Sequence, residues 1–423
     1  MLKNKSNIKN IILWNMNYIM ASKNPNIGDK VLLDSIIKCL RNSNLNININ
    51  IFTRDPIIIE KEFNVKSIKY SPFNLYNIIK TLWNSDIFIF AGGEVVIDRG
   101  SSLYTPFMMH LACLAKLLKK TIMGYGIGIG KIDEISFIGK LLSRFVFNGA
   151  IVSVRDIGSE ESLKSISEPK QIICTADPAL NLEAAPDEEV ELILVKLGIR
   201  KNGGPLIAIA PRQPLMPVKK MCEHLYNIIP MKIRELLGLV PPDFNIYLYQ
   251  FKKRLAEISD YLVQEYNAQL LFIPMFSGFM SYRDDILCHD IIEEMDSRDK
   301  VKILDSSYSG PILKRIFGKA DLVIGFPLHS IILATSMGVP AIAFSYESKV
   351  ARYMKAIGLE EYTFNIEDIS VDIDVSEVIK NINYVMSNKS TITERLDINI
   401  RCMKNNELGN IKMLMKELIE NDK

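Results

Sequence analysis

Short apolar runs alternate with longer amphipathic segments along most of the chain, and this alternation restricts the fold more than any other feature. The runs have the length of strands buried on both faces, and the segments between them have the 3.6-residue spacing of helices. Strands are expected at residues 8–14, 47–52, 65–70, 86–91, 121–126, 150–154, 172–175, 205–210, 244–249, 269–273, 301–304, 321–324 and 339–344. Strands and helices in this order predict an α/β fold with mostly parallel sheets.

The 423 residues contain two such series, which predicts two Rossmann-like domains that face each other across a cleft. The acidic, proline-containing run over 183–191 has little core signal and is the preferred boundary. We therefore predict an N-terminal domain over residues 1–190 and a C-terminal domain over 191–382. A charged helical tail over 383–423 is expected to pack back on the first domain.

Composition argues against several classes of protein. The chain has 51 basic and 49 acidic residues and no basic stripe interleaved with aromatic residues, so nucleic-acid binding is not indicated. Its six cysteines form no Cys-x-x-Cys and no Cys/His cluster, which disfavours zinc and a disulfide framework and fits a reducing cytoplasm. Asn15 and Asn17 interrupt the apolar run near the N-terminus, so we expect a first strand there and no transmembrane segment.

The stretch from Asp321 to Lys349 carries the clearest functional signal. It is typical of a strand, a turn at Gly325-Phe326-Pro327, a helix from Leu328 and a second strand. His329 then lies in the first turn of the helix, beyond the carboxyl end of a strand, where open α/β sheets bind ligands. A histidine there can be purely structural, but the helix N-terminus favours an anion and an imidazole can act as acid or base.

Other strand ends carry candidate residues with two interpretations each. Asp29 can be the N-cap of the following helix or can bind a hydroxyl-rich acceptor. Gly92 and Gly93 permit the close approach of a ligand or of a neighbouring element. Arg155 and Asp156 are expected to form a structural ion pair, and Ser159 to cap the helix after them.

The glycine run from Gly124 to Gly130 is similar to a dinucleotide-binding loop only in composition. Its spacing never gives Gly-x-Gly-x-x-Gly, so neither a nicotinamide nor a flavin cofactor is expected. We expect these glycines to serve tight packing and a ligand-facing turn.

Taken together, the short motifs resemble the polysaccharide pyruvyl transferase family. The resemblance rests on Asn26-Ile27-Gly28-Asp29, Ala91-Gly92-Gly93, Gly126-Ile127-Gly128, Ser153-Val154-Arg155-Asp156 with Ser159, Asp177-Pro178-Ala179, Arg212, Leu328-His329, Gly338-Val339-Pro340 and Tyr346 to Lys349. It implies a GT-B-like fold and transfer of pyruvate from phosphoenolpyruvate to a sugar of a cell-surface glycan or its precursor, forming a ketal. It requires no metal and no cofactor. The expected location is cytoplasmic, with or without attachment at the inner membrane face, and the acceptor can be free or lipid-linked.

The resemblance also implies roles for individual residues. His329 corresponds to the proton donor, and Arg212 to an arginine that contacts the donor substrate. Around them, the donor side is expected to include Ser330, Tyr346 and Lys349. The acceptor side is expected to include Asn26, Asp29, Gly92, Gly93 and Glu94.

Two positions depart from the family pattern. Pro327 stands where the family usually has an arginine, and Glu94 stands where a third glycine is usual. Lys349 is the favoured replacement cation, with Arg283 and Lys314 as alternatives. Two other functions remain open, a glycosyltransferase that uses a nucleotide sugar and a carbohydrate-binding relative without turnover.

Overall fold

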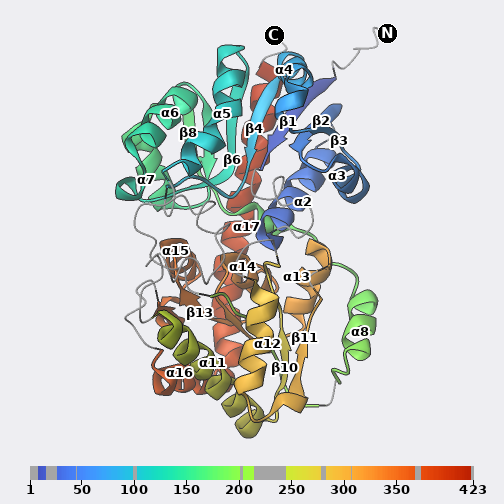
Figure 1. Ribbon diagram of the computed structural model, residues 1–423, viewed down its shortest axis with the longest axis vertical. Coiled ribbons are helices and arrows are strands. Elements are labelled where there is room, and N and C mark those ends of the chain that lie inside the picture. Colours follow the sequence, from blue (N-terminus) through green and yellow to red (C-terminus); the bar gives the residue numbers. More distant parts are fainter. Residues whose placement is uncertain are drawn as a thin grey trace. The chain divides into compact units, whose positions relative to one another are not determined.

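The computed structural model describes residues 8–15, 26–43, 45–98, 102–200, 203–213, 244–277, 283–305, 307–366 and 373–420. The chain forms two compact units, each built on one parallel sheet flanked by helices (Figure 1). Unit 1 consists of Met1–Pro25, Leu32–Asn181 and Met403–Lys423. Unit 2 consists of Asn26–Val31 and Leu182–Cys402. The predicted α/β class with two mostly parallel sheets is confirmed.

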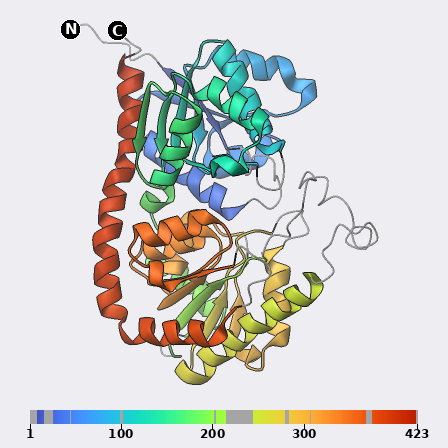
Figure 2. The ribbon, with the colours of Figure 1, turned by 90° about the vertical axis from the view of Figure 1, so that its left-hand side faces the viewer.

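In unit 1 the strand order is β3-β2-β1-β4-β6-β7-β8, with the short β5 paired to β6. The strands are β1 (Lys9–Trp14), β2 (Ile47–Thr53), β3 (Lys66–Lys69), β4 (Ile87–Ala91), β5 (Glu94–Val96), β6 (Thr121–Ile129), β7 (Ile151–Val154) and β8 (Gln171–Cys174). The connecting helices are α2 (Ile27–Arg41), α3 (Pro56–Phe63), α4 (Leu75–Trp83), α5 (Tyr104–Leu117), α6 (Phe137–Phe147) and α7 (Ile157–Ile166). Helices lie on both faces of this sheet (Figure 2), so its central strands are fully buried apolar runs.

In unit 2 the strand order is β11-β10-β9-β12-β13-β14. The strands are β9 (Leu206–Ala210), β10 (Gln269–Phe272), β11 (Val301–Ile303), β12 (Leu322–Gly325), β13 (Ala341–Ser345) and β14 (Thr363–Asn365). The helices are α8 (Asp187–Lys196), α11 (Phe244–Tyr266), α12 (Asp284–Glu294), α13 (Gly310–Gly318), α14 (Leu328–Thr335), α15 (Ser348–Ala356) and α16 (Val375–Ser387). In its core the rings of Phe326 and Phe344 stack with centroids 4.6 Å apart.

The C-terminal tail is helical, and its last part, Met403–Lys423, belongs to unit 1. Its long helix α17 (Lys389–Glu420) contributes Ile411, Met413, Leu414 and Leu418 to the hydrophobic core of that unit. Thr175 donates to the side-chain oxygen of Asn410 at 2.6 Å, which fixes the helix against the end of β8.

Two local predictions are wrong. Residues 244–249 begin the 23-residue helix α11, because Phe244, Phe251, Leu255 and Ile258 bury one helical face and this packing overrides the strand propensity of the aromatic run. The glycine run is no turn, because β6 continues to Ile129. It does serve tight packing, since a Cβ on Gly124 would lie 2.8 Å from the Ile127 side chain.

Two helix caps also differ from the prediction. Helix α2 begins at Ile27, and the Asn26 side chain accepts a hydrogen bond from the Gly28 N–H at 3.0 Å, so Asn26 takes the capping role expected for Asp29. Asp156 caps α7 by accepting from the Ser159 N–H, so Ser159 is not the cap. In both cases the residue directly before the helix makes the bond. The change of unit falls after Asn181 rather than at 190.

Candidate active site

The candidate residues of unit 2 follow four neighbouring strands at the carboxyl edge of its sheet. Arg212 follows β9, Asp284 comes after β10, His329 follows β12 and Tyr346 follows β13. The strand order reverses direction between β9 and β12, because β10 and β11 extend to one side and β13 and β14 to the other. Such a reversal is the usual ligand site of an open parallel sheet. The predicted donor side therefore lies at a topological switch point.

Helix α14 presents His329 in its first turn. Pro327 is the N-cap residue with φ −68° and ψ 133°, a conformation that its ring fixes in advance. Ser330 is fully buried and donates its hydroxyl to the Pro327 carbonyl at 2.7 Å. This hydrogen bond ties Ser330 to the residue that precedes the helix. The side chain of His329, in the same turn, is only half-buried.

The first turn of α2 packs against His329, a contact that the sequence does not reveal. A Cβ on Gly28 would lie 2.3 Å from Nδ1 of His329, so only glycine leaves room for the imidazole in this position. The Ile27 N–H donates to the Met275 carbonyl at 3.1 Å, which attaches this turn to the end of β10. The N-terminal turns of two helices thus meet at His329, and both favour an anion there. Asn26 and the buried Asp29 belong to this turn and hence to unit 2.

Arg212 has a carboxylate and an aromatic ring as neighbours. Its Nε lies 3.6 Å from Oδ1 of Asp284, and its guanidinium lies over the Phe276 ring at 5.2 Å from the centroid. The side chain of Arg212 is 15% exposed and that of Asp284 only 1%. A guanidinium is the side chain best suited to the bidentate recognition of a carboxylate or phosphate.

The sequence patterns above do not single out Asp284. Burial raises the pKa of its carboxyl to about 6, against the opposing effects of Arg212 and of hydrogen bonds from the backbone at Met275 and Phe276. The Met275 N–H donates to Oδ2 at 3.2 Å. The Arg283-Asp284-Asp285 triplet was the available signal, but only the fold shows which of its carboxylates is buried.

This raised pKa predicts a pH-dependent stability. The folded state holds the Asp284 proton up to about pH 6, whereas an ordinary aspartate loses it near 3.8, so ionisation of Asp284 lowers the free energy of unfolding as pH rises across this interval. Asp284→Asn cannot ionise, so the variant does not lose this part of the free energy of unfolding. Denaturant unfolding should show the variant gaining stability over the natural protein by up to roughly 3 kcal/mol between pH 4 and pH 7.

The neighbouring Asp285 provides the matched control. Burial raises its pKa, but the hydrogen bond and charge of Arg283 outweigh that effect and lower it. Asp285→Asn should therefore lose stability relative to the natural protein as pH rises, with the opposite sign. Parallel pH profiles for the two variants would contradict the assignment of Asp284 as the buried carboxyl.

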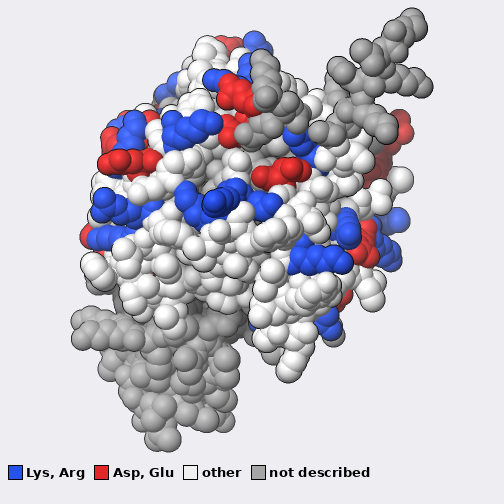
Figure 3. Space-filling view, turned by 90° about the horizontal axis from the view of Figure 1, so that it is seen from above, with Lys and Arg blue, Asp and Glu red and all other residues white. Residues whose placement is uncertain are grey.

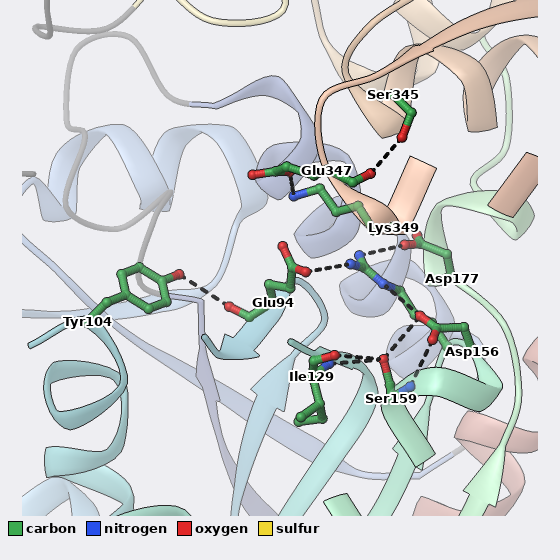
Figure 4. A network of polar contacts seen from close by, with 10 residues as sticks. Glu94, Tyr104, Ile129, Asp156, Ser159, Asp177, Ser345, Glu347 and Lys349 are labelled. Carbon is green, nitrogen blue, oxygen red and sulfur yellow. Dashed lines mark hydrogen bonds and ion pairs between the residues drawn. The ribbon is translucent and has the colours of Figure 1, made fainter. Parts of the chain in front are cut away.

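Tyr346 and Lys349 lie beyond β13. Burial, followed by the charge of Glu347, raises the pKa of the Tyr346 hydroxyl to about 12, against the opposing charges of Arg212 and Lys349. Lys349 lies in the first turn of α15 and forms an ion pair with Glu347, whose carbonyl accepts a hydrogen bond from Ser345 (Figure 4). The ammonium of Lys349 thus has a carboxylate beside it.

The alternative cations have other surroundings. Arg283 pairs with Asp285, with its Nε 3.1 Å from Oδ1, and Lys314 is buried on α13.

In unit 1 the residues Gly92 to Glu94 form the exit from β4. Gly92 and Gly93 have φ of +67° and +75°, a left-handed conformation that favours glycine. Gly92 donates to the Tyr125 carbonyl at 3.0 Å, and the Gly93 carbonyl accepts from Gly128 at 2.8 Å. The pair thus has a clear structural role in joining β4 to β6.

Arg155 forms the centre of a buried charge cluster in unit 1, larger than the single ion pair predicted. Its nitrogens lie 3.3 Å from Asp177, 3.8 Å from Asp156 and 4.0 Å from Glu94 (Figure 4). A Cβ on Gly128 would lie 2.7 Å from Nη2 of Arg155, so that glycine makes room for the guanidinium. The cluster joins the ends of β7 and β8 to the start of β5, which sequence spacing does not show.

Within the described part of the chain, no group of three or more His, Cys, Asp or Glu side chains is arranged to hold a metal ion. None of the described helices is long and apolar enough to cross a membrane.

Comparison with known proteins connects this geometry to a family. A family model described as polysaccharide pyruvyl transferase matches residues 26–348, which include Gly28, Gly92, Gly93 and His329. The amylovoran biosynthesis protein AmsJ of Erwinia amylovora is 23% identical over 329 residues, which is 77% of this chain and 71% of that protein.

Solved structures agree on the fold. A glycosyltransferase of Rickettsia africae matches with a TM-score of 0.56 and 15% identity, over 98% of this chain and 97% of that one. The UDP-GlcNAc 2-epimerase of Neisseria meningitidis matches with a TM-score of 0.57 and 12% identity, over 97% and 99%. At these identities the likeness concerns the GT-B-like fold alone.

Proposed function

The chain belongs to the polysaccharide pyruvyl transferase family, and on that premise we propose that it transfers pyruvate from phosphoenolpyruvate to a sugar of a glycan or its precursor. Membership makes it a transferase that modifies glycans; the donor and the ketal product are the proposal. The observation that carries it is the pairing of Arg212 and His329 at the ends of neighbouring strands β9 and β12.

In the proposed reaction, His329 gives its proton to the methylene carbon of phosphoenolpyruvate. The neighbouring carbon then becomes electrophilic and accepts one sugar hydroxyl. Phosphate leaves, and a second hydroxyl of the same sugar adds to close the ketal, so two sugar hydroxyl protons replace those used on carbon and phosphate. The residues must therefore supply an acid and stabilise a carboxylate and a phosphate.

The first turns of α14 and α2, which contain His329 and Gly28, support the proposal that an anion binds here. Both place the positive end of a helix dipole beside the imidazole, which favours a bound phosphate or carboxylate. A bound dianion in turn favours the imidazolium form needed for proton donation. Tyr346 and Lys349 remain candidates for the donor side. We propose that Lys349 supplies the positive charge that the family's arginine, here replaced by Pro327, would otherwise provide.

Fewer contacts support the proposed acceptor side than the proposed donor side. Asn26 and Asp29 lie in the α2 turn beside His329, so in this proposal they approach the sugar hydroxyls near the acid. Gly92, Gly93 and Glu94 belong to unit 1, where Glu94 also faces Arg155. We propose Glu94 as an acceptor contact, because a carboxylate accepts hydrogen bonds from sugar hydroxyls.

Arg212→Ala is expected to weaken donor binding by about 1.5–3 kcal/mol, because a charge-assisted hydrogen bond to an anion is lost. Isothermal titration with phosphoenolpyruvate measures this change. Arg283→Ala is the matched control, since Arg283 is exposed and pairs with Asp285. In Arg212→Ala the buried Asp284 carboxylate loses its cation, which can lower stability as well as donor binding. The double variant Arg212→Ala/Asp284→Asn also removes that carboxylate, so a loss of donor binding that persists in it belongs to Arg212 itself. Equal weakening of donor and acceptor binding would identify Arg212 as a structural residue.

Ligand-induced stabilisation tests the donor class directly. Phosphoenolpyruvate at a hundred times its Kd should raise the free energy of unfolding by about 2.7 kcal/mol, and a nucleotide sugar should leave it unchanged. Stabilisation by the nucleotide sugar alone would favour the glycosyltransferase alternative. Sugar binding without any phosphate release would favour the non-catalytic one.

A further inference from the structure

Helix α4 of unit 1 exposes an apolar face to solvent. Leu75, Tyr76, Ile79 and Trp83 lie on one side at helical spacing, and Tyr76 and Trp83 are 74% and 65% exposed. The preceding turn adds Phe73, which is fully exposed. The adjacent side of the helix is buried in the core through Ile78 and Leu82, so the apolar face of α4 is wider than the part that the core covers, and Asn77, Lys80 and Thr81 form its polar side.

Helix α6 repeats the same pattern. Phe137, Ile138, Leu141 and Phe145 have the spacing of the α4 set, and Phe137 is 81% exposed. Its inward side is fixed by the buried Val146 and Phe147. Two surface helices therefore present aromatic and aliphatic side chains outward in equivalent positions.

The two helices belong to one layer. From β3 onward the chain returns across the sheet and then advances through β4, β6 and β7 in a single direction, so right-handed crossovers place α4, α5 and α6 on the same face. Helix α5 packs beside both α4 and α6. It contributes the exposed Leu117 at its end. The exposed apolar residues of α4, α5 and α6 are called the apolar layer below.

The charges of these helices all have one sign. Together they carry Lys80, Lys116, Lys140 and Arg144 and contain no aspartate or glutamate. Helix α7, which packs beside α6 and by the same crossover rule lies on the same face, contains Glu160 and Glu161, and α2 and α3 each contain two acidic residues. The view onto the end of unit 1 where α4 and α5 lie shows Lys and Arg in a band next to an area with few charged side chains (Figure 3).

We propose that the apolar layer docks on the surface of a bilayer that contains anionic lipids. Exposed Trp, Tyr and Phe favour the boundary between head groups and acyl chains, and the basic residues of α4, α5 and α6 favour anionic head groups. A protein partner would need a shape that fits the layer, whereas a bilayer fits any convex apolar face with a basic border. This docking is independent of the donor proposed above.

Vesicle co-sedimentation tests the proposal with the full chain. The protein should sediment with vesicles of phosphatidylcholine and phosphatidylglycerol, more weakly with phosphatidylcholine alone, and less at high salt. Tyr76→Ser/Ile79→Ser/Trp83→Ser and Lys80→Glu/Lys140→Glu/Arg144→Glu should each weaken binding to the anionic vesicles by at least about tenfold. Because all six side chains lie at or near the surface, an unchanged melting temperature will confirm that the variants fold.

Ile57→Ser and Ile398→Ser are the matched controls, because these residues are equally exposed on α3 and α17. They should bind vesicles as the natural protein does. Absence of sedimentation with either vesicle, or equal binding to neutral and anionic vesicles, would overturn the proposal. It also fails if the α4 variant leaves vesicle binding intact and converts a dimer to a monomer in sedimentation velocity, since the layer would then be an interface between copies.

Discussion

His329→Gln is expected to lower kcat by about two to four orders of magnitude, the usual contribution of a general acid. Glutamine approximates the size of the imidazole and keeps a hydrogen-bond donor, but it cannot give up a proton. Binding of phosphoenolpyruvate should therefore survive, and the loss should be in kcat rather than in KM. Single-turnover measurements with saturating donor check both expectations.

Gly28→Ala is the companion variant, because it disturbs the imidazole without removing it. The added Cβ would lie 2.3 Å from Nδ1 of His329, so the ring has to move. Alanine suits the α2 helix better than glycine, and helix stability should not fall for that reason. The rate should drop although the acid is present. Normal turnover in His329→Gln would remove His329 from the mechanism, and normal turnover in Gly28→Ala alone would show that its position is not critical.

Arg155→Met is expected to lower the free energy of unfolding of unit 1 by about 3–5 kcal/mol. The substitution leaves Asp177, Asp156 and Glu94 around an apolar side chain, and the Asp177 carboxylate is almost completely buried. Removing one member of a buried ion cluster leaves the remaining charges without compensation. Denaturant unfolding, followed by a probe in each unit, measures the effect.

Arg144→Met is the matched control, since Arg144 lies exposed on α6 and its loss should change stability by less than about 0.5 kcal/mol. Arg155→Met/Asp177→Asn should recover part of the lost stability, because the most buried carboxylate becomes neutral. A loss below about 1 kcal/mol in Arg155→Met would show that the cluster is not structural, and would make Arg155 a candidate ligand-binding residue instead.

Features that depend on local order were predictable from the sequence. The parallel sheets follow from the spacing of apolar runs, and the turn, helix and strand around His329 follow from Pro327 and Gly338. The exception at 244–249 has a physical cause, because the aromatic residues that favour a strand locally also fill one face of a long helix. Only contacts made after folding decide between the two.

The site could be predicted only in part, because its most informative contacts join distant segments. Gly28 and His329 are three hundred residues apart, and nothing in either motif indicates that they touch. Asp284 and Arg212 likewise meet across neighbouring strands, and the burial that raises the pKa of Asp284 is a property of the folded unit. The residues proposed for the acceptor side show the same difficulty, since Asn26 and Asp29 belong to unit 2 although they precede most of unit 1.

The most direct test of the central claim is a phosphate-release assay with phosphoenolpyruvate and a panel of sugar and lipid-linked sugar acceptors, combined with mass spectrometry of the products. The proposed function predicts phosphate release that requires an acceptor, one phosphate for each acceptor modified, and an acceptor mass increased by that of pyruvate less one water. Loss of this release in His329→Gln would connect the reaction to the site. No release with any acceptor, together with nucleoside diphosphate release from a nucleotide sugar, would contradict the claim.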